Sequence, residues 1–352
     1  MEYRQLGRSG LRLSQLILGT MTFGGRGNFR AVGDTDLDGA RRQIDMALDA
    51  GVNVIDTANV YSGGAAEEIV GHALSDGRRD RVLLATKARF SMGPGANDAG
   101  LSRHHLIEAC EASLRRLQTD HIDLYQLHEW DGQTPLEETL GALEHLLQSG
   151  KVRYVGCSNF AGWQVMKALG IARERRLPEF VSHQVYLSLQ ERSAEFEIVP
   201  SAIDQGLGVL IWSPLAGGLL SGRYRRGQPA PAGSRHASEW NEPPVYDEDK
   251  LYDTIDVLVE IAGEYGVSAA QVALAWLRGR PGVTSVIVGA RTDEQLADNL
   301  AAANLELAPD DAARLEQVSR PTLIYPFWHQ RNTASDRLGP ADLSLLAPYL
   351  RE

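Results

Sequence analysis

Cysteine is scarce in this sequence of 352 residues, which contains only two. Neither belongs to a CxxC pair, and two cysteines cannot form a disulfide framework, so the pattern is typical of a reducing compartment. A run of about 18 apolar residues is also absent, which argues against a membrane-spanning helix. The N-terminus, MEYRQLGRSG, lacks the apolar stretch of a secretory signal. Together these absences predict a cytoplasmic protein without a membrane partner.

An excess of positive charge is absent as well: 35 Lys and Arg residues face 46 Asp and Glu residues, for a net charge of −11. A protein whose main partner is nucleic acid needs a positive surface, so we expect no nucleic-acid partner. The total does not exclude a small basic pocket for a phosphate group. Hydrophobic residues make up 43% and charged residues 23%, which excludes a disordered chain and indicates an ordinary globular protein.

Common phosphate and metal motifs are missing too. No GxxxxGK[ST] loop occurs, because Gly150-Lys151 lacks the first glycine and the hydroxyl residue. The first predicted strand is followed by GTMTFGGRGNF rather than GxGxxG, which disfavours the doubly wound dinucleotide fold. His104 and His105 are adjacent and cannot both ligate one metal ion from a helix face. We therefore expect no metal site.

Eight short apolar runs are present, and each is rich in Val, Ile or Leu at consecutive positions, as in strands buried on both faces of a parallel sheet. The runs are Leu16–Leu18, Val52–Ile55, Val82–Ala85, Ile122–Leu127, Val152–Val155, Val181–Val185, Val209–Trp212 and Val283–Val288. Segments with helical spacing lie between them, including Asp36–Ala50, Ser102–Leu117, Pro135–Gln148, Ala194–Gln205 and Thr292–Ala302. Several of these end on glycine, which suits a C-terminal helix cap. The alternation, with a spacing of about 30 residues, predicts an α/β fold of the (β/α)8 TIM-barrel type, as a single domain over residues 1–352.

Three segments fall outside this repeat. Residues 3–14 predict a short β-hairpin, because a Gly-bounded loop joins two short runs. Residues 217–249, after the seventh strand, form a long loop rich in Gly, Pro, Arg and Trp, and loops of this length are usually functional or disordered. The tail, about residues 321–352, carries Tyr325 and Trp328. We interpret it as a lid or a contact segment between subunits, and the oligomeric state stays open.

Reactive groups of a barrel enzyme lie at the carboxyl ends of its strands. Those ends carry Asp56 and Tyr61 after the second strand, Lys87 after the third and His128 after the fourth. A free tyrosine has a pKa of about 10, but a nearby ammonium favours the phenolate and lowers that pKa. A carboxylate keeps the lysine charged and positioned, so the four residues predict a proton-donating cluster. Each one alone has a structural explanation, for example an ion pair between Lys87 and Asp56.

A carboxylate-based barrel hydrolase is a competing interpretation. It needs two facing acids, and the strand ends offer Asp56 and Glu129. This alternative leaves the tyrosine and the lysine without a role.

At these residues the sequence resembles the aldo-keto reductase family. The segment VNVIDTANVYSGGAAEEIVGHAL (52–74) is similar to the family signature, and LLATKAR (83–89), DHIDLYQLHEWD (120–131) and LEETLGALEHLLQSGKVRYVGCSN (136–159) follow in the expected order. The resemblance extends from the hairpin to about residue 305. It implies a catalytic tetrad of Asp56, Tyr61, Lys87 and His128, with Tyr61 as general acid. The implied reaction is hydride transfer from NADPH to the carbonyl carbon of an aldehyde or ketone.

The resemblance also implies the residues of the cofactor site. They are Gly19, Thr20, Ser158, Asn159, Gln184, Trp212, Ser213, Leu215, Gly217, Gly289, Arg291, Gln295 and Asn299. Among these, Ser158, Asn159 and Gln184 resemble the residues that hold the nicotinamide carboxamide, and Trp212 the aromatic on which its ring stacks. The guanidinium of Arg291 suits a 2′-phosphate, which favours NADPH over NADH. Trp130 is expected to line the substrate pocket.

A second function belongs to a different class. The segment GARTDEQLADN (289–299) also resembles the potassium-channel β subunits of the same family. This implies, as an alternative, a nucleotide-sensing regulatory subunit with slow or no turnover. Ala66-Glu67 departs from the Ser-Glu that the family often has at this point. The sequence does not identify the carbonyl substrate.

Overall fold

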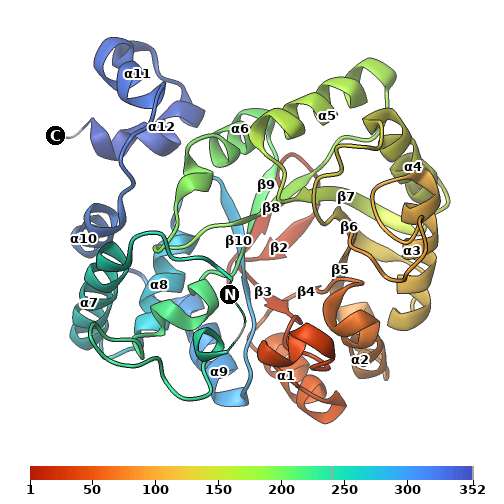
Figure 1. The fold of residues 1–352 in the computed structure, drawn as a ribbon, viewed down its shortest axis with the longest axis horizontal. Coiled ribbons are helices and arrows are strands. Elements are labelled where there is room, and N and C mark those ends of the chain that lie inside the picture. Colours follow the sequence, from red (N-terminus) through yellow and green to blue (C-terminus); the bar gives the residue numbers. More distant parts are fainter. Residues whose placement is uncertain (239, 241, 351–352) are drawn as a thin grey trace.

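The computed structural model describes residues 1–238, 240 and 242–350, and at its centre eight parallel strands close into a barrel (Figure 1). In barrel order they are β10 (Val283–Val288), β3 (Leu16–Gly19), β4 (Val54–Asp56), β5 (Leu83–Ala88), β6 (Ile122–Leu127), β7 (Val152–Ser158), β8 (Ser182–Tyr186) and β9 (Gly208–Trp212). The first and last strands close the barrel with Val286 opposite Leu16. Every residue of β6 and β10 is buried, because one face packs inside the barrel and the other against helices. The prediction of a (β/α)8 barrel is confirmed.

Helices surround the barrel, and side-chain caps fix where several of them begin. The helices are α1 (Leu37–Asp49), α2 (Ala65–Ala73), α3 (Arg103–Leu117), α4 (Leu136–Gln148), α5 (Gly162–Arg175), α6 (Ile198–Gln205), α7 (Glu248–Tyr265), α8 (Ala269–Arg278), α9 (Asp293–Ala301), α10 (Pro309–Ser319), α11 (Phe327–Thr333) and α12 (Pro340–Leu346). The side chains of Asp36 and Ser102 each accept a hydrogen bond from a backbone N–H of the first turn, as N-caps do. Gly51 and Gly150 follow α1 and α4 with positive φ, which confirms the glycine stops.

One predicted helix, 194–205, is shorter than expected. The structure has a 3₁₀ turn at Ser193–Glu195 and a helix only from Ile198. Pro200 explains the boundary, because proline lacks an N–H and is tolerated only in the first turn of a helix.

The N-terminal hairpin closes the amino end of the barrel. Strands β1 (Tyr3–Gln5) and β2 (Arg12–Ser14) pair antiparallel, as predicted. Leu6 and Leu13 flank the loop side of this pair and are buried with Val54 and Leu210 in one apolar cluster. The hairpin thus fills the barrel from below and leaves the carboxyl ends of the strands open for a site.

A buried ion cluster joins the segment before α6 to α8 and α10. Arg192 contacts Glu195 at 2.7 Å and Glu316 at 2.9 Å, and Arg280 reaches the same two carboxylates at 3.0 and 2.7 Å. Both guanidinium groups lie near the Trp276 ring, with their carbons 5.0 and 4.6 Å from its centroid. Paired charges and cation–π contacts satisfy groups that would otherwise be costly to bury.

The C-terminal tail packs on the outside of the barrel, next to α6 (Figure 1). Leu345, Leu346 and Tyr349 are buried in a small cluster with Phe196 and Phe327. Ile324, Tyr325 and Trp328 stay largely exposed, with 54%, 73% and 46% of their surface accessible.

Across the described part of the chain, no single helix has both the length and the apolar character needed to cross a membrane. Helices α7 and α8 meet these criteria only when taken together, and they are bent by 99° relative to each other.

Candidate active site

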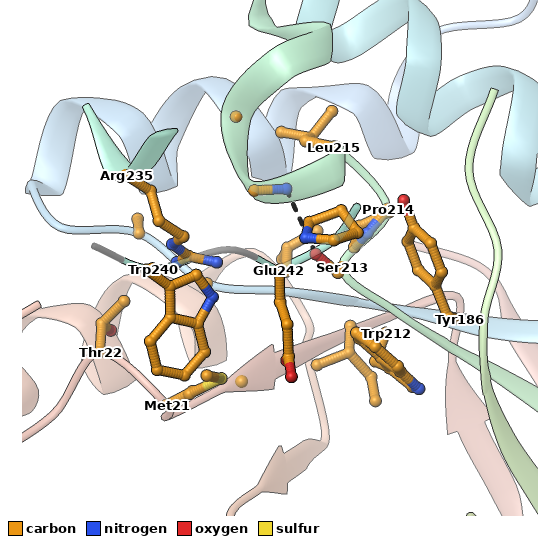
Figure 2. A pocket seen from close by; sticks show the side chains of 18 of the residues that line it. Met21, Thr22, Tyr186, Trp212, Ser213, Pro214, Leu215, Arg235, Trp240 and Glu242 are labelled. Carbon is orange, nitrogen blue, oxygen red and sulfur yellow. Dashed lines mark hydrogen bonds between the residues drawn. The ribbon is translucent and has the colours of Figure 1, made fainter. Parts of the chain in front are cut away.

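A cavity of about 900 Å³ lies at the carboxyl ends of the barrel strands. The long loop after β9 contributes one wall (Figure 2). The lining includes every residue that the sequence predicted for the site except Lys87 and Trp130: Gly19, Thr20, Asp56, Tyr61, His128, Ser158, Asn159, Gln184, Trp212, Ser213, Leu215, Gly217, Gly289, Arg291, Gln295 and Asn299. Gly19 and Asn299, which are 280 positions apart in the sequence, therefore meet in one space.

Lys87 lies directly behind this lining, fully buried on β5. Its ammonium contacts Asp56 Oδ1 at 2.5 Å, donates to the Thr57 carbonyl at 2.9 Å and reaches the Tyr61 hydroxyl at 3.4 Å. The three donors of the ammonium thus have three oxygen partners. This arrangement joins Lys87, Asp56 and Tyr61 as the sequence predicted.

The direction of the Tyr61 pKa differs from the expectation. Burial raises the pKa of the Tyr61 hydroxyl, and the Lys87 ammonium offsets this only in part. Burial is the largest single effect on Lys87 and lowers its pKa, but the contacts of the ammonium with Asp56 and Tyr61 together outweigh it, so the pKa of Lys87 is raised. Tyr61 is consequently a neutral phenol beside a firmly charged ammonium.

The second oxygen of Asp56 is held by two amides. Gln184 Nε2 donates to Asp56 Oδ2 at 2.9 Å and Gln126 Nε2 at 3.3 Å. The NH₂ group of Gln184 is therefore engaged within the protein, and its Oε1 is the atom left to face a ligand. Gln126 was not singled out from the sequence, although a glutamine inside the buried run Ile122–Leu127 is a recognisable signal.

His128 presents a neutral ring to the cavity. Burial lowers its pKa well below the ordinary value, and the charge of Lys87 adds to this effect. The ring stands edge-on to Tyr61 and Phe90, at centroid distances of 5.8 and 4.8 Å. Its Nδ1 is buried and has no partner among the described residues, which leaves Nε2 as the nitrogen able to reach a ligand.

Asn159 and Trp212 are linked to each other on the opposite wall. The indole N–H of Trp212 donates to Asn159 Oδ1 at 2.9 Å, and Asn159 Nδ2 donates to the His128 carbonyl at 3.0 Å. Asn159 adopts φ 59°, a left-handed conformation that asparagine tolerates better than most residues. Trp212 also lies against Tyr186, with centroids 4.9 Å apart (Figure 2). By contrast, the buried Ser158 hydroxyl has no partner within the described chain.

The loop after β9 begins with a tight turn. Gly217 has φ 66°, its N–H donates to Ser213 Oγ at 3.3 Å, and a Cβ there would lie 2.9 Å from His236 Nε2 (Figure 2). Glycine is thus required at this point by both conformation and space.

Arg291 lies at the far end of the cavity, but its guanidinium is already engaged. It donates to the carbonyls of Val32, Ala31 and Gly233 at 2.8, 2.5 and 2.7 Å. The sequence predicted that this group faces a phosphate. The structure shows it joining the loop after β3 to the loop after β9 through three of its five N–H donors, and its contact with a phosphate stays a prediction.

Arg235 is a site residue that sequence reasoning missed. It points into the cavity beside Trp240 (Figure 2), and its Nε is buried without a partner in the part of the chain that the structure describes. Burial, reinforced by the charge of Arg291, lowers its pKa to about 10. No sequence signal distinguishes Arg235 from the other arginines of the loop, since only the fold brings it to the cavity.

Trp130 does not line the cavity, contrary to the expectation. Its ring packs edge-on against Phe160 and Trp163, with centroids 5.2 and 5.6 Å away. The adjacent Glu129 lines the cavity instead, at a bend just beyond the end of β6. Other aromatic lining residues that the sequence did not indicate are Phe29, Phe90, Tyr186, Tyr224 and Trp240.

The C-terminal tail lies outside the cavity. None of the described residues 321–350 lines the cavity, and the buried part of the tail packs against α6.

Across the described part of the chain, no group of three or more His, Cys, Asp or Glu side chains is placed to hold a metal ion.

Comparison with known proteins agrees with this geometry. The model of the Aldo/keto reductase family matches residues 15–320. An uncharacterized oxidoreductase of Bacillus subtilis, YrpG, is 44% identical over 317 residues, covering 87% of this chain and 92% of that protein. A probable voltage-gated potassium channel subunit beta of Oryza sativa subsp. japonica is 39% identical, covering 90% and 96%. Versiconal hemiacetal acetate reductase of Aspergillus parasiticus is 35% identical, covering 93% and 99%.

The family match and the reductase relatives support carbonyl reduction as the general chemistry, with a nicotinamide cofactor. We conclude from the barrel, the family match and these relatives that the chain belongs to the aldo/keto reductase family and is an NAD(P)H-dependent oxidoreductase.

Proposed function

We propose that this protein reduces an aldehyde or ketone to the alcohol with NADPH, and that Tyr61 donates the proton. The observation that carries the proposal is the Tyr61 hydroxyl at the cavity wall, 3.4 Å from the buried ammonium of Lys87. An ion pair between Lys87 and Asp56 with a purely structural role would not require a tyrosine hydroxyl 3.4 Å from the ammonium.

The cavity offers polar atoms that fit a nicotinamide nucleotide. The Ser158 hydroxyl and Gln184 Oε1 can bond the carboxamide, and the Trp212 ring provides a stacking face. When bound, the reduced nicotinamide supplies the hydride to the carbonyl carbon. Arg223 and Arg235 lie on the loop after β9 and line the cavity; Arg223 can meet the pyrophosphate, and Arg235 the 2′-phosphate that NADH lacks.

Proton delivery follows from the contacts of Tyr61. As the carbonyl carbon gains the hydride, the oxygen becomes negative and takes the proton of the Tyr61 hydroxyl. The phenolate that remains is stabilised by the Lys87 ammonium and is protonated again from solvent. Asp56 holds Lys87 in place throughout.

His128 orients the carbonyl group. Since burial keeps the ring neutral, the imidazole can donate one hydrogen bond to the substrate oxygen without competing with Tyr61 for the role of acid. The edge-on contact with Tyr61 brings both donors to the same point of the cavity.

The preference for NADPH over NADH rests on three arginines. Arg223, Arg235 and Arg291 line the cavity away from Tyr61. Arg235, whose Nε has no described partner, suits a phosphate better than Arg291, whose N–H groups are engaged by carbonyls.

The test is loss of NADPH absorbance with a panel of aldehydes and ketones, in wild type and in Tyr61→Phe. We expect turnover in the wild type and a reduction of at least about 100-fold in the variant, in line with general acid catalysis. The Kd for NADPH, measured by fluorescence titration, should be nearly unchanged. Equal turnover in Tyr61→Phe would show that another group donates the proton.

A second candidate is a nucleotide-sensing regulatory subunit. It is favoured by two relatives, from Oryza sativa and Arabidopsis thaliana, that are named as probable potassium channel β subunits and are 39% and 37% identical. A single-turnover measurement separates the two functions. Very slow oxidation of bound NADPH by every carbonyl tested, together with a stable protein partner, would favour the regulatory function.

A further inference from the structure

The charged residues of the cavity are unevenly distributed. Its arginines, Arg223, Arg235 and Arg291, come from the loops after β9 and β10. Among the described lining residues around Tyr61 and His128, by contrast, no Lys or Arg occurs. The cation at the end where the carbonyl group must lie is Lys87, which is buried behind the lining and paired with Asp56.

Aromatic rings separate the two ends. Tyr61 lies 5.7 Å from Phe29, and Phe29 lies 6.0 Å from Trp240, measured between ring centroids. Arg235 lies beside Trp240, the last ring of this row (Figure 2). On the other flank of Tyr61, Phe90 packs against His128 at 4.8 Å. A substrate at Tyr61 is thus surrounded by apolar rings.

Glu129 is the acidic residue at this end. It follows His128 directly, lines the cavity and is half-buried. Its Oε1 accepts a hydrogen bond from the Trp130 backbone N–H at 2.9 Å, and the other oxygen has no partner among the described residues. Burial raises the pKa of this carboxyl, while the Trp130 N–H and the charge of Arg89 act against the rise. Arg89 itself does not line the cavity and donates to the Trp130 carbonyl.

The other acidic lining residues differ from Glu129. Asp56 is compensated by the ammonium of Lys87, and Asp298 accepts hydrogen bonds from Ser268 and Gln271. Glu242 points into the cavity between Trp240 and Trp212 (Figure 2), but it is exposed to solvent, so its field is screened more strongly.

We propose that Glu129 selects the substrate by charge: the carbonyl site accepts neutral or cationic aromatic aldehydes and ketones and rejects anionic ones. A carboxylate on the cavity wall next to His128, with one oxygen that no described residue contacts, repels a second carboxylate and accepts a hydrogen bond from a hydroxyl or ammonium group. The anionic cofactor is not affected in the same way, since its phosphates fit the arginine end. This inference rests on the proposed function.

The test compares 4-formylbenzoate, which is anionic, with 4-formylbenzamide, which is neutral and of similar size, and with cationic 4-(trimethylammonio)benzaldehyde. The enzymes are wild type, Glu129→Gln, Glu242→Gln and Glu137→Gln. Glu137 is exposed on α4 outside the cavity. Glu137→Gln is the control variant, because it changes the net charge by the same amount as Glu129→Gln without changing the cavity. Since ratios are compared between variants, the intrinsic reactivity of each aldehyde cancels.

We expect the wild type to favour the amide and the cation over the anion. Glu129→Gln should raise the ratio of kcat/KM for the anion over the amide by about five-fold or more, the order given by one charge about 8 Å away in a partly screened site. The ratio should stay at the wild-type value in Glu137→Gln and change less in Glu242→Gln. A wild type that reduces the anion as well as the amide overturns the proposal. So does a Glu129→Gln variant with the wild-type ratio.

Binding is measured in parallel, because it does not require turnover. The same compounds are titrated by calorimetry into protein saturated with NADP⁺, where no hydride is available. A preference in binding for the neutral or cationic compound over the anion that is lost in Glu129→Gln supports the selection by charge, even if no compound is reduced. Absence of reduction would then contradict the proposed reaction but not the selection. The same affinity for anion and amide in the wild type contradicts the selection.

Discussion

At the scale of single residues, the chemistry of the site depends on how the buried ammonium of Lys87 is compensated. Lys87 has no surface exposed to solvent, and its three donors end on Asp56, the Thr57 carbonyl and Tyr61. A buried charge without such partners would be strongly destabilising. Tyr61 is therefore at once a partner of the ammonium and the group that faces the cavity.

The pH dependence of reduction follows from the directions of two pKa values. Tyr61 must be protonated to donate, and burial raises its pKa above the ordinary 10.0. His128 must stay neutral, and burial moves its pKa well below 6.5. We expect kcat/KM for a neutral aldehyde to be flat from about pH 6 to about pH 9 and to fall only at higher pH. A break near neutral pH in single-turnover rates would contradict these assignments.

Residues at strand ends could be predicted from the strand pattern, whereas loop residues were predicted only where the family resemblance pointed to them, as with Leu215 and Gly217. Asp56, Lys87, His128 and Gln184 follow from the rule that reactive groups lie at carboxyl ends of barrel strands. Glu129 and Trp130 show where that rule stops, because the direction of a side chain beyond the last strand residue depends on the loop backbone. The direction in which the pKa of Tyr61 is shifted could not be predicted from the sequence either, because it depends on how deeply the hydroxyl is buried.

At the scale of elements, Arg291 joins two loops across the far end of the cavity. Its guanidinium connects the carbonyls of Ala31 and Val32 to that of Gly233. Arg235, by contrast, has a buried Nε with no described partner. We therefore propose different roles for the two arginines, with Arg291 holding loops together and Arg235 binding a ligand.

This difference gives a prediction for cofactor binding. Arg235→Gln should raise the Kd for NADPH by about 10-fold or more and leave the Kd for NADH almost unchanged, because it removes a charge-assisted hydrogen bond to phosphate. Arg291→Gln should weaken both cofactors, since it releases both loops. Fluorescence titration measures all four constants, with Lys167→Gln on α5 as a control for net charge. An equal loss of NADPH and NADH in Arg235→Gln would rule out its phosphate role.

The tail gives a prediction for stability. Leu346 is 1% exposed in the cluster with Phe196 and Phe327. Leu346→Ala should lower the free energy of unfolding by about 2–4 kcal/mol, while the partly exposed Leu343→Ala should have a smaller effect. Denaturant titration measures both.

The same variant tests the lid interpretation of the tail. Since no described tail residue lines the cavity, kcat should remain close to the wild-type value in Leu346→Ala while the protein stays folded. Loss of kcat under such conditions would favour a lid.

At the scale of the whole molecule, the barrel was predictable because its pattern is repeated. Eight buried runs and intervening helical periods support one another, so an error of a few residues at any boundary leaves the architecture unchanged. The helix expected at 194–205 is such an error, and it begins later because of Pro200. The net charge of −11 gave no hint of the arginines gathered at one end of the cavity, since a sum over the chain contains no positions.

Buried histidines predict acid sensitivity of the fold. Burial lowers the pKa of His183 to about 4, and its Nε2 accepts a hydrogen bond from the Phe160 N–H. In the unfolded chain His183 binds a proton near pH 6.5, whereas in the folded chain it stays neutral until about pH 4. Its contribution to the free energy of unfolding is therefore fully present above pH 6.5 and is lost as pH falls toward 4. His183 alone accounts for about 3 kcal/mol on this scale.

Unfolding in urea at pH 7 and pH 5 measures this loss. His183→Gln keeps a hydrogen-bond acceptor but cannot be protonated, so its stability should fall less between the two pH values than that of the wild type. The same decrease in both proteins would assign the acid sensitivity to other groups, such as His105 and His236, whose pKa values burial also lowers.

The cluster of two arginines, two glutamates and Trp276 has a consequence for how the chain opens. The cluster connects α10 and the turn before α6 to α8. Each glutamate forms ion pairs with both arginines, so no single ion pair can be broken without affecting the others. Opening α10 would leave buried charges unpaired, so its amide hydrogens should exchange with solvent only when the whole barrel unfolds. The exposed segment at Ile324 and Tyr325 has no such fastening among its described contacts. A protease would cut there first and leave an intact barrel behind.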